Sequence, residues 1–471
     1  MTVRFDARIT REDLRGKRVT IVGLGKGRTS AGLARFLVAN GARVTITDAK
    51  SREALAEGIA RVGDTPVELV LGPSSDDAAL ADADLVFVIP GVRPRSATIL
   101  RAVQRDIPVL TEIGLFFQLC PAPIVGVTGT KGKTTTTTML EGMLSRGPRR
   151  VITGGNIGRA VIQDLDIITR DDVVLLELSS FQLETLTASP HVAVITNVSE
   201  DHLDHHGTRE AYLAAKRNIV AWQGRRDVAV LNLDDPTVVA MHTGAESEVR
   251  GFSLSLRPRR GAFVDAEGRL ALTDGATATP LVGRAELRVP GRHNVANALA
   301  AAIAAHAMGV APESIGTALR EFEGVPRRLE PVGERDGVLW VNDSAATTPA
   351  ATLTAIAAFD RPAVVILGGV AKGADFGALA RGLAGRARAA VLIGQAADDI
   401  ATAIAAAGPR DLVVRRAATL AEAVEAARDI ARAGDVVLLS PACASFDMFA
   451  SADDRGDQFV ELVRPLIGGA S

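Results

Sequence analysis

The sequence predicts an α/β fold of three domains, each built on a parallel sheet. Three stretches, beginning near residues 18, 122 and 338, open with an apolar run of the kind that forms a buried strand. The first two pass into a glycine-rich turn and a helix-like segment, and strand-like and helix-like segments alternate along the chain. Such alternation is typical of parallel sheets whose strands are joined by helices. At 471 residues the chain is long enough for about three domains.

Composition excludes several other classes of protein. A hydrophobic content of 47% with 23% charged residues indicates a soluble globular protein. The formal net charge of −2 argues against a nucleic-acid partner. Cys120 and Cys443 lie far apart in the chain, which favours a reduced, cytoplasmic setting. Residues 1–6 do not resemble a signal peptide, and the alanine-rich run Ala296–Ala311 is too short and polar to span a bilayer, so we expect a buried helix and no membrane partner.

The first block predicts a nucleotide ligand. Residues 18–48 read as a strand, a glycine turn, a helix and a second strand that ends in an acid. Gly23, Gly25 and Gly27 form a partial dinucleotide fingerprint, with Asp48 at the end of the second strand. A diphosphate at the start of the helix fits this pattern. The alternative is a tight turn followed by a solvated aspartate.

The second block contains a candidate phosphate loop. The apolar run 122–125 leads into the glycine- and threonine-rich segment 126–135. Backbone N–H groups in such a turn bind phosphate oxygens, Lys133 is placed to reach the β- and γ-phosphates, and the Thr134 hydroxyl is placed to hold Mg²⁺. Val127 stands where the common pattern has glycine, so a purely structural turn is the alternative.

Two further residues of this block follow strand-like runs and are candidate metal ligands. Glu177 ends one apolar run and His202 follows the next. Because the carboxyl ends of parallel strands share one edge of a sheet, both are placed to hold Mg²⁺ beside the phosphate loop. A solvated acid at the end of a strand is the alternative for Glu177. His205 and His206 are expected on the surface.

Lys216 lies in a predicted amphipathic helix over residues 209–219. Its spacing predicts a surface lysine, and with a usual pKa of about 10.4 it is a cation that cannot bind a metal ion.

The remainder of the chain continues the α/β pattern. Residues 261–272 predict a hairpin within the second block. A third block begins near residue 325, with strand-like runs at 338–342, 363–367, 389–393 and 435–440.

Taken jointly and in order, the motifs resemble those of the Mur ligase family, the ATP-dependent amide ligases of bacterial cell-wall precursor synthesis. The shared motifs are Gly129-Thr-Lys-Gly-Lys-Thr134, Gly155-Asn-Ile-Gly158, Glu177-Leu-Ser-Ser-Phe-Gln-Leu-Glu184, Asn197-Val-Ser-Glu-Asp-His202, Gly291-Arg-His-Asn-Val-Ala-Asn297, Asn342-Asp-Ser344, Lys372-Gly-Ala-Asp-Phe376 and Leu439-Ser-Pro-Ala-Cys-Ala-Ser445.

The resemblance implies a fold and an activity. The expected domains are a Rossmann-like UDP-sugar-binding domain at 1–121, a P-loop ATPase-like ATP-binding domain at 122–324, and a Rossmann-like amino-acid-binding domain at 325–471. Within the family the chain is most similar to the branch that adds D-glutamate to UDP-N-acetylmuramoyl-L-alanine through an acyl phosphate. A cytoplasmic monomer that uses ATP and two Mg²⁺ ions is expected.

The resemblance also implies roles for individual residues. Lys133, His202 and Lys216 are the expected catalytic residues, and Lys216 matches a lysine that CO₂ converts to a carbamate, an anion able to bind the second Mg²⁺. The expected metal ligands are Thr134, Glu177, His202 and Lys216. The expected ATP-binding residues are Gly129, Thr130, Lys131, Gly132, Lys133, Thr134, Thr135, Asn294, Asn297, Arg328 and Asp343. The expected UDP-substrate residues are Gly23, Gly25, Gly27, Asp48, Pro90, Gly91 and Asn156, with Asn156 at the muramoyl sugar. The glutamate residues are Thr347, Lys372 and Ser445.

Two positions depart from the family pattern. Ala345 stands where a lysine is expected and Ala452 where a phenylalanine is expected. Both departures fall in the amino-acid pocket, so a ligase that adds L-glutamate is one alternative. A folylpolyglutamate-synthase-like ligase is another, which the glycine-turn first domain disfavours. A non-catalytic scaffold protein and a stand-alone NTPase switch are further alternatives.

Overall fold

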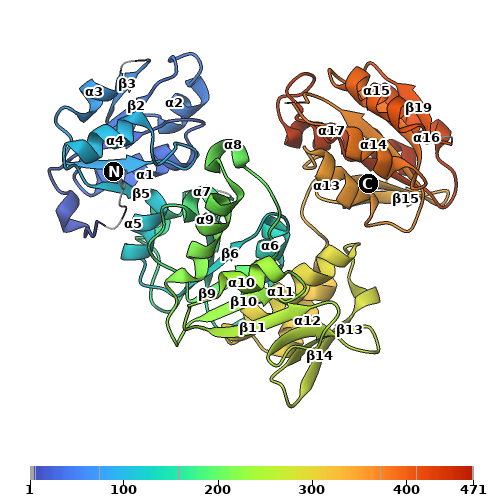
Figure 1. Cartoon of the computed structure of the whole chain (residues 1–471), viewed down its shortest axis with the longest axis horizontal. Coiled ribbons are helices and arrows are strands. Elements are labelled where there is room, and N and C mark those ends of the chain that lie inside the picture. Colours follow the sequence, from blue (N-terminus) through green and yellow to red (C-terminus); the bar gives the residue numbers. More distant parts are fainter. Residues whose placement is uncertain are drawn as a thin grey trace. The chain divides into compact units, whose positions relative to one another are not determined.

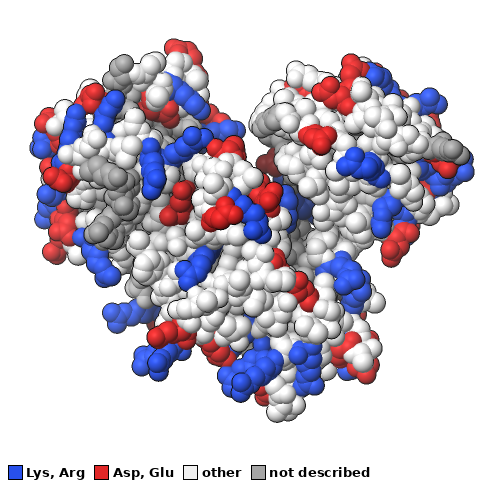
Figure 2. All heavy atoms as spheres, in the orientation of Figure 1, with Lys and Arg blue, Asp and Glu red and all other residues white. Residues whose placement is uncertain are grey.

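The computed structural model describes residues 5, 7–73, 75–157, 160–371, 373–409 and 411–468. The chain forms two compact units, Met1–Arg284 with Val295–Arg320, and Ala285–Asn294 with Glu321–Ser471. Each unit has α/β character, as the sequence predicts (Figure 1). On the face drawn in Figure 2, acidic and basic side chains intermingle, in keeping with the small net charge. Within the described ranges, every helix is too short or too polar to cross a membrane.

The first sheet of the larger unit is parallel, with strand order β3-β2-β1-β4-β5. Its strands are β1 Arg18–Val22, β2 Arg43–Asp48, β3 Val67–Leu71, β4 Leu85–Val88 and β5 Val109–Thr111. The associated helices are η1 Glu12–Leu14, α1 Arg28–Ala39, α2 Ala56–Val62, α3 Ser75–Leu80, α4 Ala97–Gln104 and α5 Glu112–Leu119. The direction of strand succession reverses between β1 and β4, which in open α/β sheets is where ligands bind. The Rossmann-like prediction is confirmed.

The second sheet of this unit has nine strands in the order β14-β13-β12-β11-β10-β9-β6-β8-β7. Its strands are β6 Ile124–Thr128, β7 Val151–Gly155, β8 Val173–Glu177, β9 Val192–Ile195, β10 Val228–Asn232, β11 Glu248–Ser253, β12 Gly261–Val264, β13 Arg269–Thr273 and β14 Ala278–Gly283. Pairing is parallel from β7 through β12, and β12 to β14 are antiparallel, which confirms the predicted hairpin. Every residue of β6 is buried, because helices cover both faces of a parallel sheet.

The helices of this region include the predicted alanine-rich helix. They are α6 Lys133–Leu144, η2 Val161–Asp164, α7 Ser180–Leu183, α8 Leu203–His206, α9 Arg209–Ala221, α10 Pro236–Met241, η3 Arg284–Glu286, α11 Arg292–Ala307 and α12 Pro312–Glu321. The alanines from Ala298 to Ala305 in α11 have no exposed surface. The alanine-rich run is therefore a core helix, as predicted.

The smaller unit contains a six-stranded sheet in the order β15-β16-β20-β17-β18-β19. Its strands are β15 Glu330–Arg335, β16 Val338–Asn342, β17 Ala363–Gly368, β18 Ala387–Ile393, β19 Val413–Arg416 and β20 Val436–Leu439, parallel except for β15. Its helices are α13 Pro349–Ile356, α14 Gly377–Leu383, α15 Ala397–Ala407, α16 Leu420–Ile430 and α17 Ala452–Ile467. One apolar cluster includes Leu379 and Ile400, and another includes Val424 and Phe459, so the sheet is covered on both faces.

Candidate active site

The predicted site residues of the nine-stranded sheet gather at one edge. Strands β7, β8, β6 and β9 are parallel neighbours, so their carboxyl ends lie together. Asn156 follows β7, Glu177 ends β8, the phosphate loop follows β6, and His202 follows β9. This arrangement confirms the reasoning that placed these side chains at a common edge.

The phosphate loop has the predicted strand–turn–helix geometry. β6 ends at Thr128 and α6 begins at Lys133, with Thr134 and Thr135 in its first turn. Gly132 lies at the left-handed φ of 84°, and a Cβ there would approach the Asn297 side-chain oxygen to 2.4 Å. The loop therefore requires glycine at this position, and Asn297 lies directly against it. An exposed helix N-terminus of this kind binds anions.

Neighbouring segments fix the shape of this loop. The Thr130 hydroxyl accepts a hydrogen bond from the Ser199 amide at 2.9 Å, and the Lys131 amide donates to the Asn197 side chain at 3.0 Å. The Lys133 ammonium donates to the carbonyl oxygens of Gly129 and Thr130, each at 3.0 Å. Hydrogen bonds with the segment that follows β9 therefore hold the phosphate loop in its conformation.

Glu177 has the environment expected of a metal ligand. Glu177 is 2% exposed, and its Oε1 accepts a hydrogen bond from the side-chain amide of Asn156 at 2.8 Å. Its Oε2 is buried and accepts no hydrogen bond in the described structure. Because burying an unsatisfied carboxylate oxygen is costly, this atom fits a site for a hard cation such as Mg²⁺. Asn156, predicted at the muramoyl sugar, orients this carboxylate.

The surface prediction for Lys216 is wrong, because the residue is 1% exposed. Its ammonium donates to the Gly129 carbonyl at 2.8 Å and lies 4.9 Å from the centre of the Tyr212 ring. Burial, with a smaller contribution from the nearby positive charge of Lys133, lowers the pKa of Lys216 to about 7. Tyr212 and Ile219 lie on the same buried face of α9, so helical spacing relative to them was the signal that sequence reasoning missed.

The histidines after β9 differ in exposure. The His202 side chain is 46% exposed, at the left-handed residue that precedes α8. The side chains of His205 and His206 are 9% and 0% exposed, so their predicted surface location is wrong. Both rings pack against Phe181, which a local reading of the sequence did not identify.

In the first sheet, the glycine turn follows β1, one of the two strands between which the strand order reverses, and contacts Asp48 at the end of β2. Gly23, Gly25 and Gly27 all have positive φ values, of 96°, 51° and 78°. The Asp48 carboxylate accepts hydrogen bonds from the amides of Leu24 at 2.9 Å and Gly25 at 3.2 Å. Asp48 thus shapes the turn. The predicted Pro90 and Gly91 follow β4, the strand adjacent to β1.

The smaller unit contains the remaining predicted residues. Asp343 is 7% exposed and accepts hydrogen bonds from the Ser440 hydroxyl at 2.7 Å and the Leu329 amide at 3.2 Å, while burial raises its pKa to about 7. Ser445 is 1% exposed, and its buried hydroxyl makes no hydrogen bond in the described structure. Arg328 and Thr347 are exposed. The side-chain amide of Asn294 donates a hydrogen bond to the Pro290 carbonyl at 2.7 Å. Lys372 lies outside the described residues.

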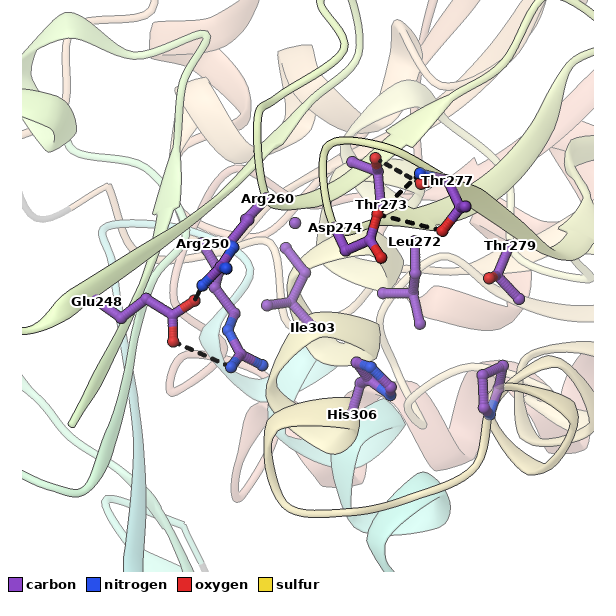
Figure 3. A pocket seen from close by; sticks show the side chains of 12 residues that line it. Glu248, Arg250, Arg260, Leu272, Thr273, Asp274, Thr277, Thr279, Ile303 and His306 are labelled. Atoms are coloured by element: carbon purple, nitrogen blue, oxygen red, sulfur yellow. Dashed lines mark hydrogen bonds and ion pairs between the residues drawn. The ribbon is translucent and has the colours of Figure 1, made fainter. Parts of the chain in front are cut away.

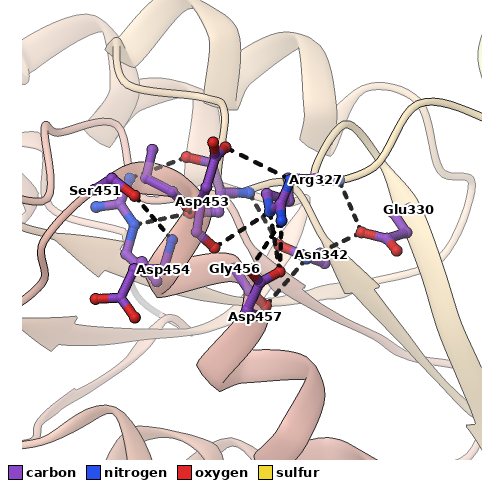
Figure 4. A network of polar contacts seen from close by, with 11 residues as sticks. Arg327, Glu330, Asn342, Ser451, Asp453, Asp454, Gly456 and Asp457 are labelled. Carbon is purple, nitrogen blue, oxygen red and sulfur yellow. Dashed lines mark hydrogen bonds and ion pairs between the residues drawn. The ribbon is translucent and has the colours of Figure 1, made fainter. Parts of the chain in front are cut away.

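A polar network holds the segment around Ala345 and the start of α17 (Figure 4). The Arg327 guanidinium donates three hydrogen bonds to the Asp457 carboxylate, at 2.7, 2.9 and 3.1 Å. The backbone carbonyl of Arg327 accepts a hydrogen bond from the Ala345 backbone amide. Arg455 is fully buried and donates to the hydroxyl and carbonyl of Ser344, each at 3.0 Å. Burial lowers the pKa of Arg455 to about 10. Sequence reasoning did not identify Arg455, since nothing local distinguishes it from a surface arginine.

A pocket of about 230 Å³ lies elsewhere in the larger unit (Figure 3). Strands β11 to β14 and helix α11 supply most of its lining, including Glu248, Arg250, Arg260 and His306. Glu248 accepts hydrogen bonds from Arg250 at 3.1 Å and from Arg260 at 2.8 Å. The lining strands occupy the opposite end of the strand order from β7 and β8, so this pocket is separate from the phosphate-loop edge.

Three family models match the chain. The Mur ligase MurD-like N-terminal domain matches residues 17–111, the Mur ligase middle domain 127–305, and the Mur ligase, glutamate ligase domain 327–443. A UDP-N-acetylmuramoylalanine–D-glutamate ligase from Symbiobacterium thermophilum is 43% identical over 96% of this chain and 98% of its own length. A protein of the same description from Pelotomaculum thermopropionicum is 42% identical over 97% of this chain and all of its own length.

A solved structure agrees at the level of the fold. UDP-N-acetylmuramate–alanine ligase from Thermotoga maritima is 22% identical, with a TM-score of 0.59, over 96% of this chain and 100% of that one. The family models and the full-length relatives establish that the chain belongs to the Mur ligase family.

Proposed function

We propose that this chain is an ATP-dependent ligase that joins D-glutamate to UDP-N-acetylmuramoyl-L-alanine in the synthesis of peptidoglycan precursors. The observation that carries the proposal is the relationship over nearly the whole chain to ligases of that description. The phosphate loop and the buried carboxylate of Glu177 supply the chemistry that such a ligase needs.

The chemistry follows from charge. A carboxylate is a poor electrophile, so the L-alanyl carboxylate first attacks the γ-phosphate of ATP, which forms an acyl phosphate and releases ADP. The amine of glutamate then attacks the carbonyl carbon, loses a proton, and displaces phosphate to leave an amide. Lys133 offsets negative charge on the transferring group, and the α6 N-terminus orients the phosphates. Bound Mg²⁺ would supply Lewis-acid charge stabilisation, held by Thr134, Glu177 and His202.

Lys216 is proposed to act as a carbamate. Its amine, with a pKa lowered to about 7, is substantially uncharged at neutral pH and can attack CO₂. The nitrogen gains a bond to carbon and loses a proton, which converts a cation into an anion suited to bind the second Mg²⁺. The burial of Lys216 near the positive charge of Lys133 supports this modification, since both favour the neutral amine over the cation.

The division of labour between domains completes the proposal. The predicted boundaries are 1–121 for the UDP-sugar, 122–324 for ATP and 325–471 for glutamate. Asn294, Arg328 and Asp343 are proposed to contact ATP, and Thr347, Lys372 and Ser445 to contact glutamate. The buried hydroxyl of Ser445, which makes no hydrogen bond to any described residue, supports a ligand there. A monomer remains a prediction, which light scattering checks against 49.1 kDa.

The deciding experiment measures phosphate release with ATP, Mg²⁺ and UDP-N-acetylmuramoyl-L-alanine, with D-glutamate or L-glutamate in parallel. Release with D-glutamate alone is expected. Release with L-glutamate alone would keep the ligase mechanism and overturn the stereochemistry. In that case the Ala345→Lys and Ala452→Phe variants would test whether the two departures cause the change.

Further arms separate the other classes. Release with a folate acceptor and none with the UDP-sugar would indicate the folylpolyglutamate-synthase-like reaction. Release that is independent of any acceptor would indicate an NTPase switch. A Lys133→Met variant serves as the inactive control, since it removes the cation of the phosphate loop and leaves the acceptor-binding residues unchanged.

A further inference from the structure

Three side chains with metal-binding atoms lie together on the side of α7 and α8. Glu184 directly follows α7, and His205 and His206 are the last residues of α8. The Phe181 ring packs against both imidazoles, with centroid distances of 4.5 and 5.6 Å. None of these residues belongs to the set assigned above to Mg²⁺, and the reaction as described does not use them.

The distances suit a small coordination sphere. His205 Nε2 lies 3.0 Å from Glu184 Oε2, and His206 Nδ1 lies 3.8 Å from the same oxygen. One ligand atom from each of the three residues can be chosen so that all lie within 4.8 Å of one another. Bonds of about 2.0–2.1 Å in a tetrahedral site place neighbouring ligand atoms about 3.4 Å apart. The distances of 3.0 and 3.8 Å fall on either side of that value, so small side-chain rotations would bring the atoms into range.

His206 supplies a second, independent observation. Its side chain has no exposed surface, and its Nδ1 makes no hydrogen bond within the described residues. Its other ring nitrogen, Nε2, lies 3.0 Å from the Ser180 hydroxyl. An imidazole that is held by a hydrogen bond at one nitrogen and binds the ion through the other is the usual arrangement of a metal-binding histidine. Without a metal ion, the buried Nδ1 is left without a hydrogen-bond partner, which costs free energy.

We propose that Glu184, His205 and His206 form a binding site for a divalent transition-metal ion of the zinc class. Two imidazoles and one carboxylate favour such an ion over Mg²⁺ or Ca²⁺, which prefer oxygen ligands. The Glu184 side chain is 28% exposed, so water can reach the fourth position. The bound ion would join α7 to α8, and α8 begins immediately after His202.

The test is a titration of the metal-free full-length protein with Co²⁺, a spectroscopic substitute for Zn²⁺, in excess Mg²⁺. We expect one equivalent to bind with the visible absorption of a four-coordinate site. The His205→Gln and Glu184→Gln variants are expected to lose that absorption and to bind Co²⁺ at least about tenfold more weakly. Circular dichroism of the metal-free variants checks that they fold.

Two further variants separate this site from others. His191→Gln is the matched control, because the His191 ring also contacts a carboxylate, 2.9 Å from Asp227, but belongs to no cluster of three metal-binding side chains among the described residues. It should leave the absorption unchanged. In His202→Ala the absorption should survive. The proposal is overturned if wild type binds no Co²⁺ in excess Mg²⁺, or if the absorption disappears in His202→Ala and persists in His205→Gln. Ligase activity is not the readout, so failure here is distinct from failure of the proposed function.

Discussion

Replacing Lys216 by methionine is expected to change how stability depends on pH. Burial lowers the pKa of the lysine from 10.5 to about 7. At about 1.4 kcal/mol per pH unit, this difference corresponds to a cost of burying the cation of about 5 kcal/mol. Methionine has a similar length and cannot titrate, so it removes that cost at every pH.

The sign follows from proton binding. Below pH 7 the lysine is charged in both states, and the full cost reduces stability. Between about 7 and 10.5 the unfolded chain holds a proton that the folded protein lacks, so stability rises with pH by about 1.4 kcal/mol per unit. Above 10.5 the cost is absent. From pH 7.5 to 9.5 the free energy of unfolding of wild type should therefore rise by about 2.7 kcal/mol relative to Lys216→Met.

The assay is urea unfolding followed by circular dichroism at both pH values, in CO₂-free buffer. The lost hydrogen bond to Gly129 affects both pH values equally, so the change with pH isolates the titration. Lys50→Met, at an exposed lysine, is the matched control and should show no change with pH relative to wild type. An equal difference between wild type and Lys216→Met at pH 7.5 and 9.5 would refute the reasoning, because the folded protein would then retain the proton. Bicarbonate should further stabilise wild type only.

Three other predictions concern buried or constrained positions. Glu177→Gln should lower phosphate release by roughly 100-fold or more, because it removes a negative metal ligand, while circular dichroism stays unchanged. Gly132→Ala should weaken nucleotide binding, measured by equilibrium dialysis, because alanine at this left-handed residue costs about 1–2 kcal/mol and meets Asn297. Gly142→Ala in α6, where an added Cβ would lie 4.0 Å from the Arg146 side chain, should leave nucleotide binding intact. Burial raises the pKa of Glu112 from 4.5 to about 7, so the wild-type protein loses stability as the pH rises through this range. Glu112→Gln should therefore be more stable than wild type by up to about 3 kcal/mol at pH 8, and as stable as wild type at pH 4. The same stability difference at both pH values would contradict this prediction.

The sequence was sufficient to predict the phosphate-loop edge because its signals are local. A strand, a glycine turn and a helix follow one another in the chain, and parallel pairing then places Glu177 beside them. The environment of Lys216 was not predicted, since it depends on how α9 packs against β6 and the loop that follows it. His206 escaped for the same reason: α8 is a single short turn, and Phe181, which covers its ring, precedes it by 25 positions in the chain.

The phosphate loop contains its own acceptors for the charge of Lys133. The Lys133 ammonium already donates hydrogen bonds to the carbonyl oxygens of Gly129 and Thr130. An anion that binds Lys133 therefore replaces these hydrogen bonds instead of adding to them. A sulfate or free phosphate ion offers little net gain in such an exchange. A polyphosphate chain also interacts with the α6 N-terminus and with bound Mg²⁺, so its new interactions outweigh the Lys133 hydrogen bonds that it displaces. The hydrogen bonds within the loop therefore favour a polyphosphate over a small anion.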